Sequence, residues 1–233
     1  MRILALDTAT SACSVALLNG DQTLSRFELA ERSHTQKLMP MIDDLLQEMG
    51  LQLNQLDAIA FTHGPGSFTG IRIGFAAVQG LAMGAKLPVV PISTLQLMAA
   101  TASRKLNLQP GTKIYPLLDA RMNELYVGHY RLTKVNVDKV ADDQLVPVSD
   151  SFIADAEIDS AGVGVGDGWV LLPETDLIEQ VYPDLLPEAE DILPIATANL
   201  ANAKLCDIRD IEPLYLRDRV SWQKRKWLRD RQN

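Results

Sequence analysis

The chain has 233 residues, of which 47% are apolar and 22% are charged, and its formal net charge is −8. This composition excludes a disordered chain, a collagen and a coiled-coil rod, and it is typical of a globular protein of one or two domains. No apolar run reaches the roughly 20 residues of a bilayer-spanning helix, and an acid as early as Asp7 argues against a secretory signal, so we expect a cytoplasmic protein with no membrane segment.

The first 50 residues predict three strands and a helix. Arg2–Asp7 is a short apolar strand, and 11–18 and 23–30 are predicted as two more because the Asn19-Gly20 pair between them is typical of a hairpin. A helix is predicted over 33–49, since its apolar residues recur at helical spacing and form one stripe. The stripe consists of Leu38, Met41, Ile42, Leu45, Leu46 and Met49.

A glycine-rich loop at 63–72 lies between a predicted strand at 57–62 and a predicted helix at 69–84. Glycines let the backbone turn tightly and approach a ligand, and free amides at the start of a helix attract phosphate. Arg72 would lie in the first helical turn, where the helix dipole disfavours a cation, so we expect it to face a ligand anion or an internal carboxylate. An ordinary turn held by an internal salt bridge explains the spacing equally well. The candidate anion-binding residues are Gly64, Gly66, Ser67 and Arg72.

The predicted helix contains an uncharged run, Ile73 to Ala85, whose single polar side chain is Gln79. A helix that is apolar all round is buried all round. One face can pack against the sheet, and the other needs a second helix, another subdomain or another chain. Because an exposed apolar face of this size would promote aggregation, we expect an intermolecular contact here.

The rest of the chain continues the alternation of strands and helices. The predicted elements, in order, are a strand at 87–92, a helix at 94–106, strands at 113–118, 124–131 and 161–165, and a helix at 191–205. Residues 132–160 and 173–194 show no clear pattern. Because the loop at 107–111 is a natural boundary, we expect an α/β protein with subdomains at 1–108 and 109–217 and a tail at 218–233.

Acidic residues follow the first strand of each half. Asp7 and Thr8 end one strand, and Asp119 and Arg121 follow the other. Two aspartates in these places could flank a nucleotide and its Mg²⁺, but ordinary turn carboxylates are an equally good interpretation. The three histidines lack the spacing of metal ligands, and no Ser-His-Asp arrangement is visible in the sequence. The residues alone therefore identify no reaction.

Basic residues gather at the C-terminus. Residues 217–233 hold seven basic and two acidic side chains, a net charge of +5, which leaves −13 for residues 1–216. An acidic body repels phosphate backbones, whereas this tail, with Trp222 and Trp227, could contact RNA through charge and stacking. A solvated terminus is the simpler interpretation.

Four blocks resemble the TsaB (YeaZ) family of bacterial tRNA threonylcarbamoyladenosine biosynthesis proteins. They are Ile3-Leu-Ala-Leu-Asp-Thr-Ala-Thr10, Gly64-Pro-Gly-Ser-Phe-Thr-Gly-Ile-Arg72, Asp119-Ala-Arg-Met-Asn-Glu-Leu-Tyr126 and Pro213-Leu-Tyr-Leu-Arg217. The resemblance covers nearly the whole chain. It implies an actin-like ATPase (ASKHA) fold, with two related α/β subdomains, mixed sheets and flanking helices. It also implies a role, with TsaD and TsaE, in transferring threonylcarbamoyl from threonylcarbamoyl-AMP to N6 of the adenosine beside the anticodon.

The resemblance also implies that this chain is not the catalyst. The paralogue TsaD carries a His-x-x-x-His metal motif after the helix that follows the glycine loop. In this sequence Thr94 and Met98 stand at those positions, and neither replaces a neutral imidazole as a ligand for iron or zinc. We therefore expect no metal, no catalytic residue and a noncatalytic subunit.

In the family, the two N-terminal helices pack against TsaD or a second copy. We therefore expect a homodimer when the chain is alone, tRNA contact only through the complex, and ATP or ADP near the interface rather than in this chain's own cleft. The alternative is an autonomous ATPase or a sugar-kinase-like phosphotransferase that uses Asp7, Asp119 and the glycine loop. The expected interface residues are Leu38, Met41, Leu45, Phe75, Val78 and Met83.

Overall fold

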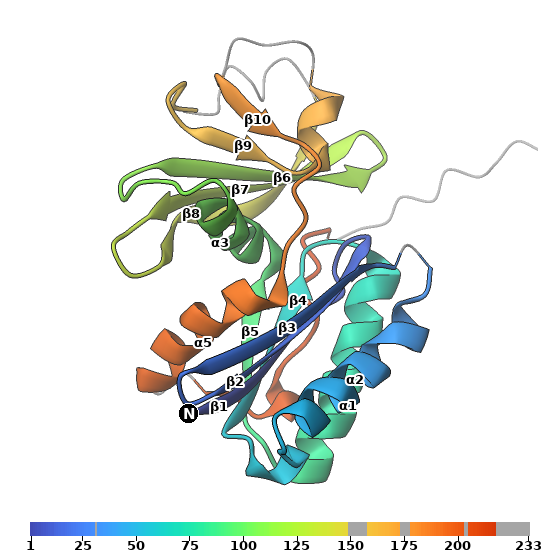
Figure 1. Cartoon of the computed structure of the whole chain (residues 1–233). Coiled ribbons are helices and arrows are strands. Elements are labelled where there is room, and N and C mark those ends of the chain that lie inside the picture. Colours follow the sequence, from blue (N-terminus) through green and yellow to red (C-terminus); the bar gives the residue numbers. More distant parts are fainter. Residues whose placement is uncertain (31, 149–157, 173–177, 203–204, 218–233) are drawn as a thin grey trace, which may run out of the picture.

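The computed structural model describes residues 1–30, 32–148, 158–172, 178–202 and 205–217, which form two lobes, each built on a five-stranded sheet (Figure 1). In the first lobe the strand order is β3-β2-β1-β4-β5, with antiparallel pairing among β1, β2 and β3 and parallel pairing among β1, β4 and β5. These strands are β1 Arg2–Asp7, β2 Ala12–Asn19, β3 Gln22–Leu29, β4 Ala58–Gly64 and β5 Val89–Ser93.

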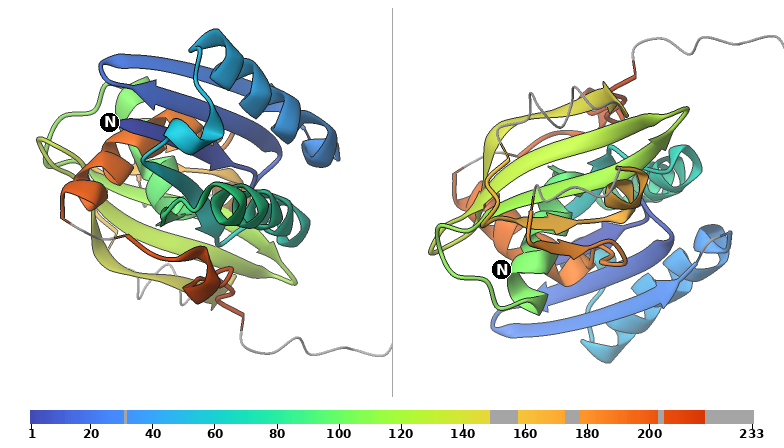
Figure 2. Two further views of the ribbon diagram at one scale, coloured as in Figure 1. Left: turned by 90° about the horizontal axis from the view of Figure 1, so that it is seen from below. Right: turned by 90° about the horizontal axis from the view of Figure 1, so that it is seen from above.

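Helices cover both faces of the first sheet, which explains why its central strands are apolar throughout instead of alternating. Leu4 packs in the cluster that includes α1 (His34–Glu48) and α2 (Phe68–Ala85), whereas its neighbour Ile3 packs in the cluster that includes α5 (Ile192–Ala201). Successive residues of a strand point to opposite faces, so each apolar residue of β1 has a helix to pack against. Figure 2 shows α1 and α2 lying together on one side of this sheet.

The second lobe has the strand order β10-β9-β6-β7-β8. The pairs β6–β7 and β7–β8 are antiparallel hairpins, and β6, β9 and β10 run parallel, so this sheet is also mixed. These strands are β6 Lys113–Arg121, β7 Glu124–Leu132, β8 Val137–Pro147, β9 Val163–Val165 and β10 Gln180–Tyr182.

One helix joins the lobes. Helix α3 (Thr94–Lys105) begins directly after β5 of the first sheet, but its buried side chains pack mainly on β6, β7 and β8 of the second. The remaining elements are short 3₁₀ helices, namely η1 Leu53–Gln55, η2 Asp167–Leu171, η3 Ala189–Asp191 and η4 Ile208–Asp210.

The predicted elements agree with the observed ones within a few residues, with two omissions and one shorter helix. Strand β8 was not predicted because most of its side chains are exposed and polar, so it lacks an alternating pattern and depends on its pairing with β7. Strand β10 has only three residues, too few to give a pattern. The last helix ends at Ala201 rather than near 205.

The observed lobe boundary differs from the predicted one. The chain crosses to the second lobe after α3, as expected, but it returns before η3, so the second subdomain does not extend to 217. Helix α5 packs on β1, β4 and β5, Cys206 pairs with Val89 of β5, and η4 lies against α2. The reason is that the second face of the first sheet needs an apolar cover, which Ile192 and Ile195 of α5 supply. The predicted tail, 218–233, lies outside the described residues.

Within the described part of the chain, no helix combines the length and the apolar character needed to cross a membrane.

Candidate functional site

Asp7, at the end of β1, has no exposed surface. Its Oδ1 atom accepts hydrogen bonds from the Thr62 hydroxyl and, at 3.2 Å, from the Ala9 amide. Its Oδ2 atom has no partner among the described residues. Burial disfavours the ionised form and raises the pKa of Asp7 to about 6. Asp7 is therefore a buried, half-satisfied carboxylate, which costs stability when it is charged.

The glycines of the 63–72 loop bring it against the turn that follows β1. The Thr8 hydroxyl donates to the Gly70 carbonyl at 2.8 Å, and the Ser67 amide donates to the Ala9 carbonyl at 2.7 Å. A Cβ atom on Gly70 would lie 2.0 Å from the Thr8 carbonyl oxygen, and one on Gly66 would lie 2.4 Å from that of Ala9. The loop was expected to approach a ligand, but here it approaches the chain's own backbone. The amide of Ser67 is already bonded in this contact.

Arg72 does not face a carboxylate in the described structure. Its guanidinium carbon lies 3.6 Å from the centre of the Phe68 ring, and its Nε donates to the Tyr215 hydroxyl at 2.9 Å. Of the two alternatives for Arg72, the internal salt bridge is therefore not found among the described residues, because the exposed helix end gives the cation an aromatic ring and a hydroxyl instead.

Asp119 lies in the second lobe, and its side chain forms hydrogen bonds within the turn that follows it. Its two oxygens accept the Arg121 amide and guanidinium, both at 2.7 Å. The three residues from Arg121 to Asn123 all have left-handed backbone angles, with φ between 58° and 63°. Such a run is strained for residues other than glycine, so the carboxylate of Asp119 stabilises the turn between β6 and β7.

Residues 213–217 bridge the two segments that were expected to flank a nucleotide. A Cβ atom on Gly64 would lie 2.6 Å from the Leu214 carbonyl oxygen, so this segment lies directly on the glycine loop. Arg217, three residues on, forms an ion pair with Glu124 of β7, beside the Asp119 turn. The structure therefore groups Asp7 and Thr8 with the glycine loop in the first lobe and places Asp119 in the second, and the segment 213–217 contacts both the glycine loop and the strand beside the Asp119 turn.

Most of the expected interface residues belong to the core of the first lobe. Four of the six have at most 5% of their surface exposed, because the apolar stripe of α1 and one side of α2 face the sheet and each other. The assignment of these residues to an exposed surface is therefore corrected. The buried residues are Leu38, Met41, Leu45 and Val78.

Helix α2 nevertheless keeps an exposed side, so it is not buried all round. Phe75 is half-buried against Phe61, with ring centroids 6.0 Å apart, whereas Met83 is 55% exposed. Around Met83 the exposed side carries small or uncharged residues, among which Gly80 and Gly84 have no atom near the position of an added Cβ. We call this exposed side the α2 face, and it consists of Ala76, Gln79, Gly80, Met83 and Gly84.

Comparison with known proteins decides the family. The model of the TsaD family, tRNA N6-adenosine threonylcarbamoyltransferase, matches residues 25–161. The Escherichia coli K12 protein called tRNA threonylcarbamoyladenosine biosynthesis protein TsaB is 41% identical over 230 residues, which cover 96% of this chain and 98% of that protein. This chain belongs to the TsaB family. The Haemophilus influenzae TsaB protein is 40% identical, over 96% of this chain and 97% of its own.

A solved structure of a TsaB family member confirms the fold. The structure of YeaZ from Pseudomonas aeruginosa superposes with a TM-score of 0.84 at 37% identity, covering 92% of this chain and 99% of that one. Together with the two mixed sheets and their flanking helices, this match confirms the expected α/β, actin-like (ASKHA) architecture.

The two positions that the family resemblance equates with the TsaD histidines are buried. Thr94 and Met98, on the first two turns of α3, have no exposed surface. Met98 packs in the core of the second lobe, where its terminal methyl would lie 2.5 Å from a Cβ on Gly166. The Thr94 hydroxyl has no partner among the described residues. These side chains act here as packing at the junction of the lobes.

A polar cluster that sequence reasoning missed ties the lobes together at the same place. The Ser93 hydroxyl caps α3 by accepting the Leu95 amide at 3.2 Å, and it also donates to Asp143 of β8. The Tyr130 hydroxyl donates to the other oxygen of Asp143 at 2.6 Å. A serine directly before the predicted helix at 94–106 was the available sign of the cap, but its distant partners had no signal in the sequence.

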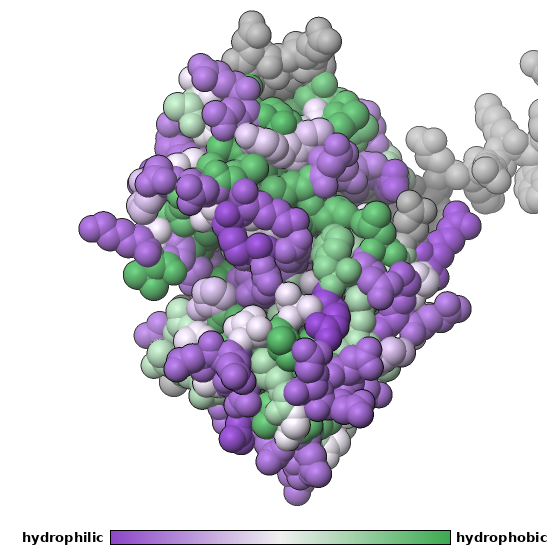
Figure 3. Space-filling view, in the orientation of Figure 1, coloured by the Kyte–Doolittle hydropathy of each residue, from purple (hydrophilic) through white to green (hydrophobic). Residues whose placement is uncertain are grey.

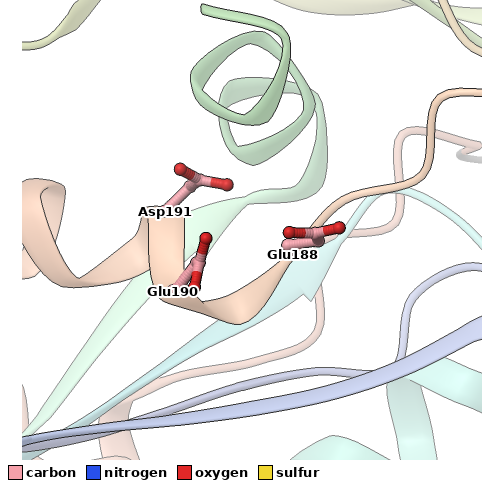
Figure 4. A group of neighbouring side chains, drawn as sticks. All are labelled: Glu188, Glu190 and Asp191. Carbon is pink, nitrogen blue, oxygen red and sulfur yellow. The ribbon is translucent and has the colours of Figure 1, made fainter. Parts of the chain in front are cut away.

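Three carboxylates gather between α3 and α5 (Figure 4). Each is paired with a cation of α3. Arg104 binds Glu190 and Asp191, both at 2.7 Å, and Lys105 binds Glu188. The group is thus a salt-bridge network of three carboxylates and two cations that attaches α5 to α3.

An open groove of about 540 Å³ lies between the edge strand β3 and the end of β10 with the segment that follows it. Phe27 and Leu29 line one side, and Val181 and Tyr182 line the other. On the face shown in Figure 3, apolar patches lie among hydrophilic side chains. None of the predicted site residues lines this groove.

Proposed function

We propose that this protein is a noncatalytic partner subunit of TsaD in the synthesis of threonylcarbamoyladenosine in tRNA. With TsaE, the complex transfers threonylcarbamoyl from threonylcarbamoyl-AMP to N6 of the adenosine beside the anticodon. Family membership supports the pathway, since the E. coli relative is called a tRNA threonylcarbamoyladenosine biosynthesis protein. The single structural observation that carries the role is the exposed, uncharged α2 face.

The α2 face is suited to packing against another helix pair. Small residues such as Gly80 and Gly84 let a second helix approach closely, and the exposed Met83 supplies an adaptable apolar contact. On the neighbouring helix α1, Met39 is 39% exposed and offers a further apolar contact. The same surface on a second copy would be self-complementary, which gives a homodimer when TsaD is absent. Compared with the interface expected from the family resemblance, the proposed interface still uses Met83 and the helices α1 and α2. The expected residues that proved to be buried are replaced by exposed residues of the same helices.

The described residues support a subunit without chemistry of its own. Asp7 is buried, the Ser67 amide is bonded within the chain, and Asp119 is paired with Arg121. At the position of the TsaD metal motif, Thr94 and Met98 serve as packing. We propose that the chain binds no cofactor by itself, that ATP or ADP binds near the interface of the complex, and that tRNA is reached through the complex in the cytoplasm.

One observation favours the alternative of an autonomous ATPase or sugar-kinase-like phosphotransferase. The free Oδ2 of Asp7, with a pKa of about 6, is the kind of group that could bind Mg²⁺ or a proton. This alternative predicts ATP turnover by the purified chain with Mg²⁺, and loss of that turnover in Asp7→Asn.

Reconstitution separates the two functions. With TsaD, TsaE, threonylcarbamoyl-AMP and unmodified tRNA, we expect modified adenosine to form only when this chain is present, as measured by mass spectrometry of nucleosides. Because Asp7 has no chemical role in our proposal, Asp7→Asn is expected to support the same yield within about twofold. Modification without the chain would contradict the proposal, and so would ATP turnover by the chain alone that Asp7→Asn abolishes.

A further inference from the structure

Two edge strands line the groove between the lobes. Strand β3 ends the first sheet and β10 ends the second, and both contribute side chains to the groove of about 540 Å³. Ligand clefts commonly have volumes of roughly 300–1,000 Å³, so this groove is large enough to hold a binding partner. None of the residues of the α2 face lines it. The groove is therefore a surface separate from the docking face proposed above.

The groove side of β3 is apolar. Phe27 and Leu29, which line the groove, are 41% and 64% exposed. Alternate residues of a strand point to opposite faces, so Arg26 and Glu28 point away from the groove, where both form ion pairs with side chains of α1. Edge strands of soluble proteins usually carry charges that prevent pairing with another chain. This protection is missing on the side of β3 that faces the groove.

The outer edge of β3 pairs with no strand among the described residues. The carbonyl oxygens of Ser25 and Leu29 instead accept hydrogen bonds from the side chains of Arg26 and Lys37, at 3.0 and 3.1 Å. Both donors are long side chains that are partly exposed, so the backbone amides of an incoming strand can replace them. A strand added here would continue the sheet and place every second side chain on the groove side.

The rim of the groove is acidic. Lys105 lines the groove and belongs to the network of three carboxylates and two cations, and the Ser25 hydroxyl donates to Glu190 of that network at 2.9 Å. Asp184 also lines the groove and forms no ion pair within the described part of the chain. The rim therefore has two more carboxylates than cations. Such a rim attracts a cation, and it repels phosphates and the same rim on a second copy.

We propose that this groove binds an extended segment of a partner protein that adds to the edge of β3. The segment carries apolar side chains at alternate positions and a lysine or arginine at the end of the same face. Its apolar side chains pack against Phe27 and Leu29 on one wall. On the other wall they meet Val181 and Tyr182 of β10, each 38% exposed. The cation meets the excess carboxylates, so main-chain bonds supply affinity while the groove and its rim supply specificity. This interaction goes beyond the proposed function and does not depend on the α2 face.

Fluorescence anisotropy of the full-length chain with two labelled probe peptides tests the proposal. The first probe is acetyl-Lys-Thr-Val-Thr-Val-Thr-Lys-amide, whose valines and lysines share one face of a strand and whose sequence reads the same in both directions. The second probe has glutamate in place of both lysines. We expect the lysine peptide to bind at least about 10-fold more tightly, because the rim attracts one peptide and repels the other.

Variants of the groove locate the binding. Leu29→Lys places a cation in the groove at an exposed position, so the chain should stay folded by circular dichroism and bind the lysine peptide at least about 10-fold more weakly. The matched control is Val135→Lys, which adds the same charge at a side chain that is 83% exposed outside the groove. It should stay within about twofold of the native chain. Asp184→Asn removes one rim charge and should weaken binding of the lysine peptide by about 2- to 5-fold.

Three results would overturn the proposal. The native chain could bind neither peptide, it could bind both equally, or Leu29→Lys could bind the lysine peptide as the native chain does. Light scattering supplies a further check for a second copy as the occupant. A dimer that Leu29→Lys abolishes and Gly80→Arg retains would assign the groove to self-association and would also overturn the proposal.

Discussion

At the end of β1, the buried carboxylate of Asp7 has one bonded oxygen and one oxygen without a partner among the described residues. Its pKa is about 6 in the folded protein, against an ordinary value of 3.8. The folded state therefore holds the proton more tightly than the unfolded state between these two values. The contribution of Asp7 to stability is therefore expected to fall as the pH rises from about 4 to about 6 and then to stay level, and its ionisation costs about 3 kcal/mol.

Asp7→Asn is expected to remove that cost. The amide has a similar shape and carries no charge, so the variant should be about 1–3 kcal/mol more stable than the native protein at pH 7.5, and this advantage should shrink by about 2 kcal/mol at pH 4.5. Urea unfolding followed by circular dichroism at both pH values measures the difference. A variant that is less stable by the same amount at both pH values would show that the ionised carboxylate is satisfied in the folded protein.

The glycines of the 63–72 loop give a second test at the scale of single residues. Gly70→Ala would place a methyl group against the backbone of Thr8, so we expect a loss of about 3 kcal/mol in the free energy of unfolding. Gly84→Ala, near the other end of the same helix, meets no atom within 4 Å and should gain up to about 1 kcal/mol. Thermal melts at low protein concentration compare them, and equal melting temperatures would contradict the close packing.

The glycine loop also shows what spacing cannot decide. An approach to a ligand and an approach to the chain's own backbone both require the absence of a Cβ atom, so the sequence predicted the tight geometry but not its partner. Arg72 is a similar case. Its place near a helix start predicted a compensating contact, but the contact is with Phe68 and Tyr215, and the latter is 143 residues away along the chain.

At the scale of elements, the two N-terminal helices differ in what their sequences determine. The apolar stripe of α1 identified its buried side, including Leu38 and Leu45, although we first placed that side at an interface. Helix α2 is apolar on every side, so periodicity could not separate Val78 in the core from Met83 on the surface. Which side faces the sheet is decided by tertiary packing.

The attachment of α5 to α3 depends on one arginine. Arg104 binds Glu190 and Asp191, and the side chain of Asp191 is only 8% exposed. Arg104→Ala leaves this buried carboxylate unpaired, and because Arg104 itself is 43% exposed we expect a moderate loss of about 1–3 kcal/mol in stability.

Arg209 provides the matched control for this prediction. It pairs with Asp207 at 2.5 Å, but its side chain is 72% exposed. Arg209→Ala should therefore leave the free energy of unfolding nearly unchanged. Urea unfolding of the two variants should separate them clearly, and equal effects would show that the network around Arg104 adds nothing beyond a surface ion pair.

For the whole molecule, the sequence predicted two α/β lobes and most of their strands, because each has a buried apolar strand near its start. It did not predict that the chain returns to the first lobe. The return allows α5 to cover the second apolar face of the first sheet, which includes Ile3, Ala60 and Ile92. Contacts of this kind join residues far apart in sequence, so neither local propensity nor spacing reveals them.

The central claim is that this molecule acts by docking its α2 face on TsaD. Light scattering after size-exclusion chromatography tests it with Gly80→Arg, a change whose Cβ atom meets nothing within 4 Å in the monomer but whose long side chain would block a close helix contact. The control is Val135→Arg, an equally exposed change on the second lobe, where the native side chain is 83% exposed. We predict that Gly80→Arg remains a folded monomer, alone and with TsaD, while Val135→Arg forms both the homodimer and the heterodimer. If Gly80→Arg assembles as the native chain does, the docking surface lies elsewhere.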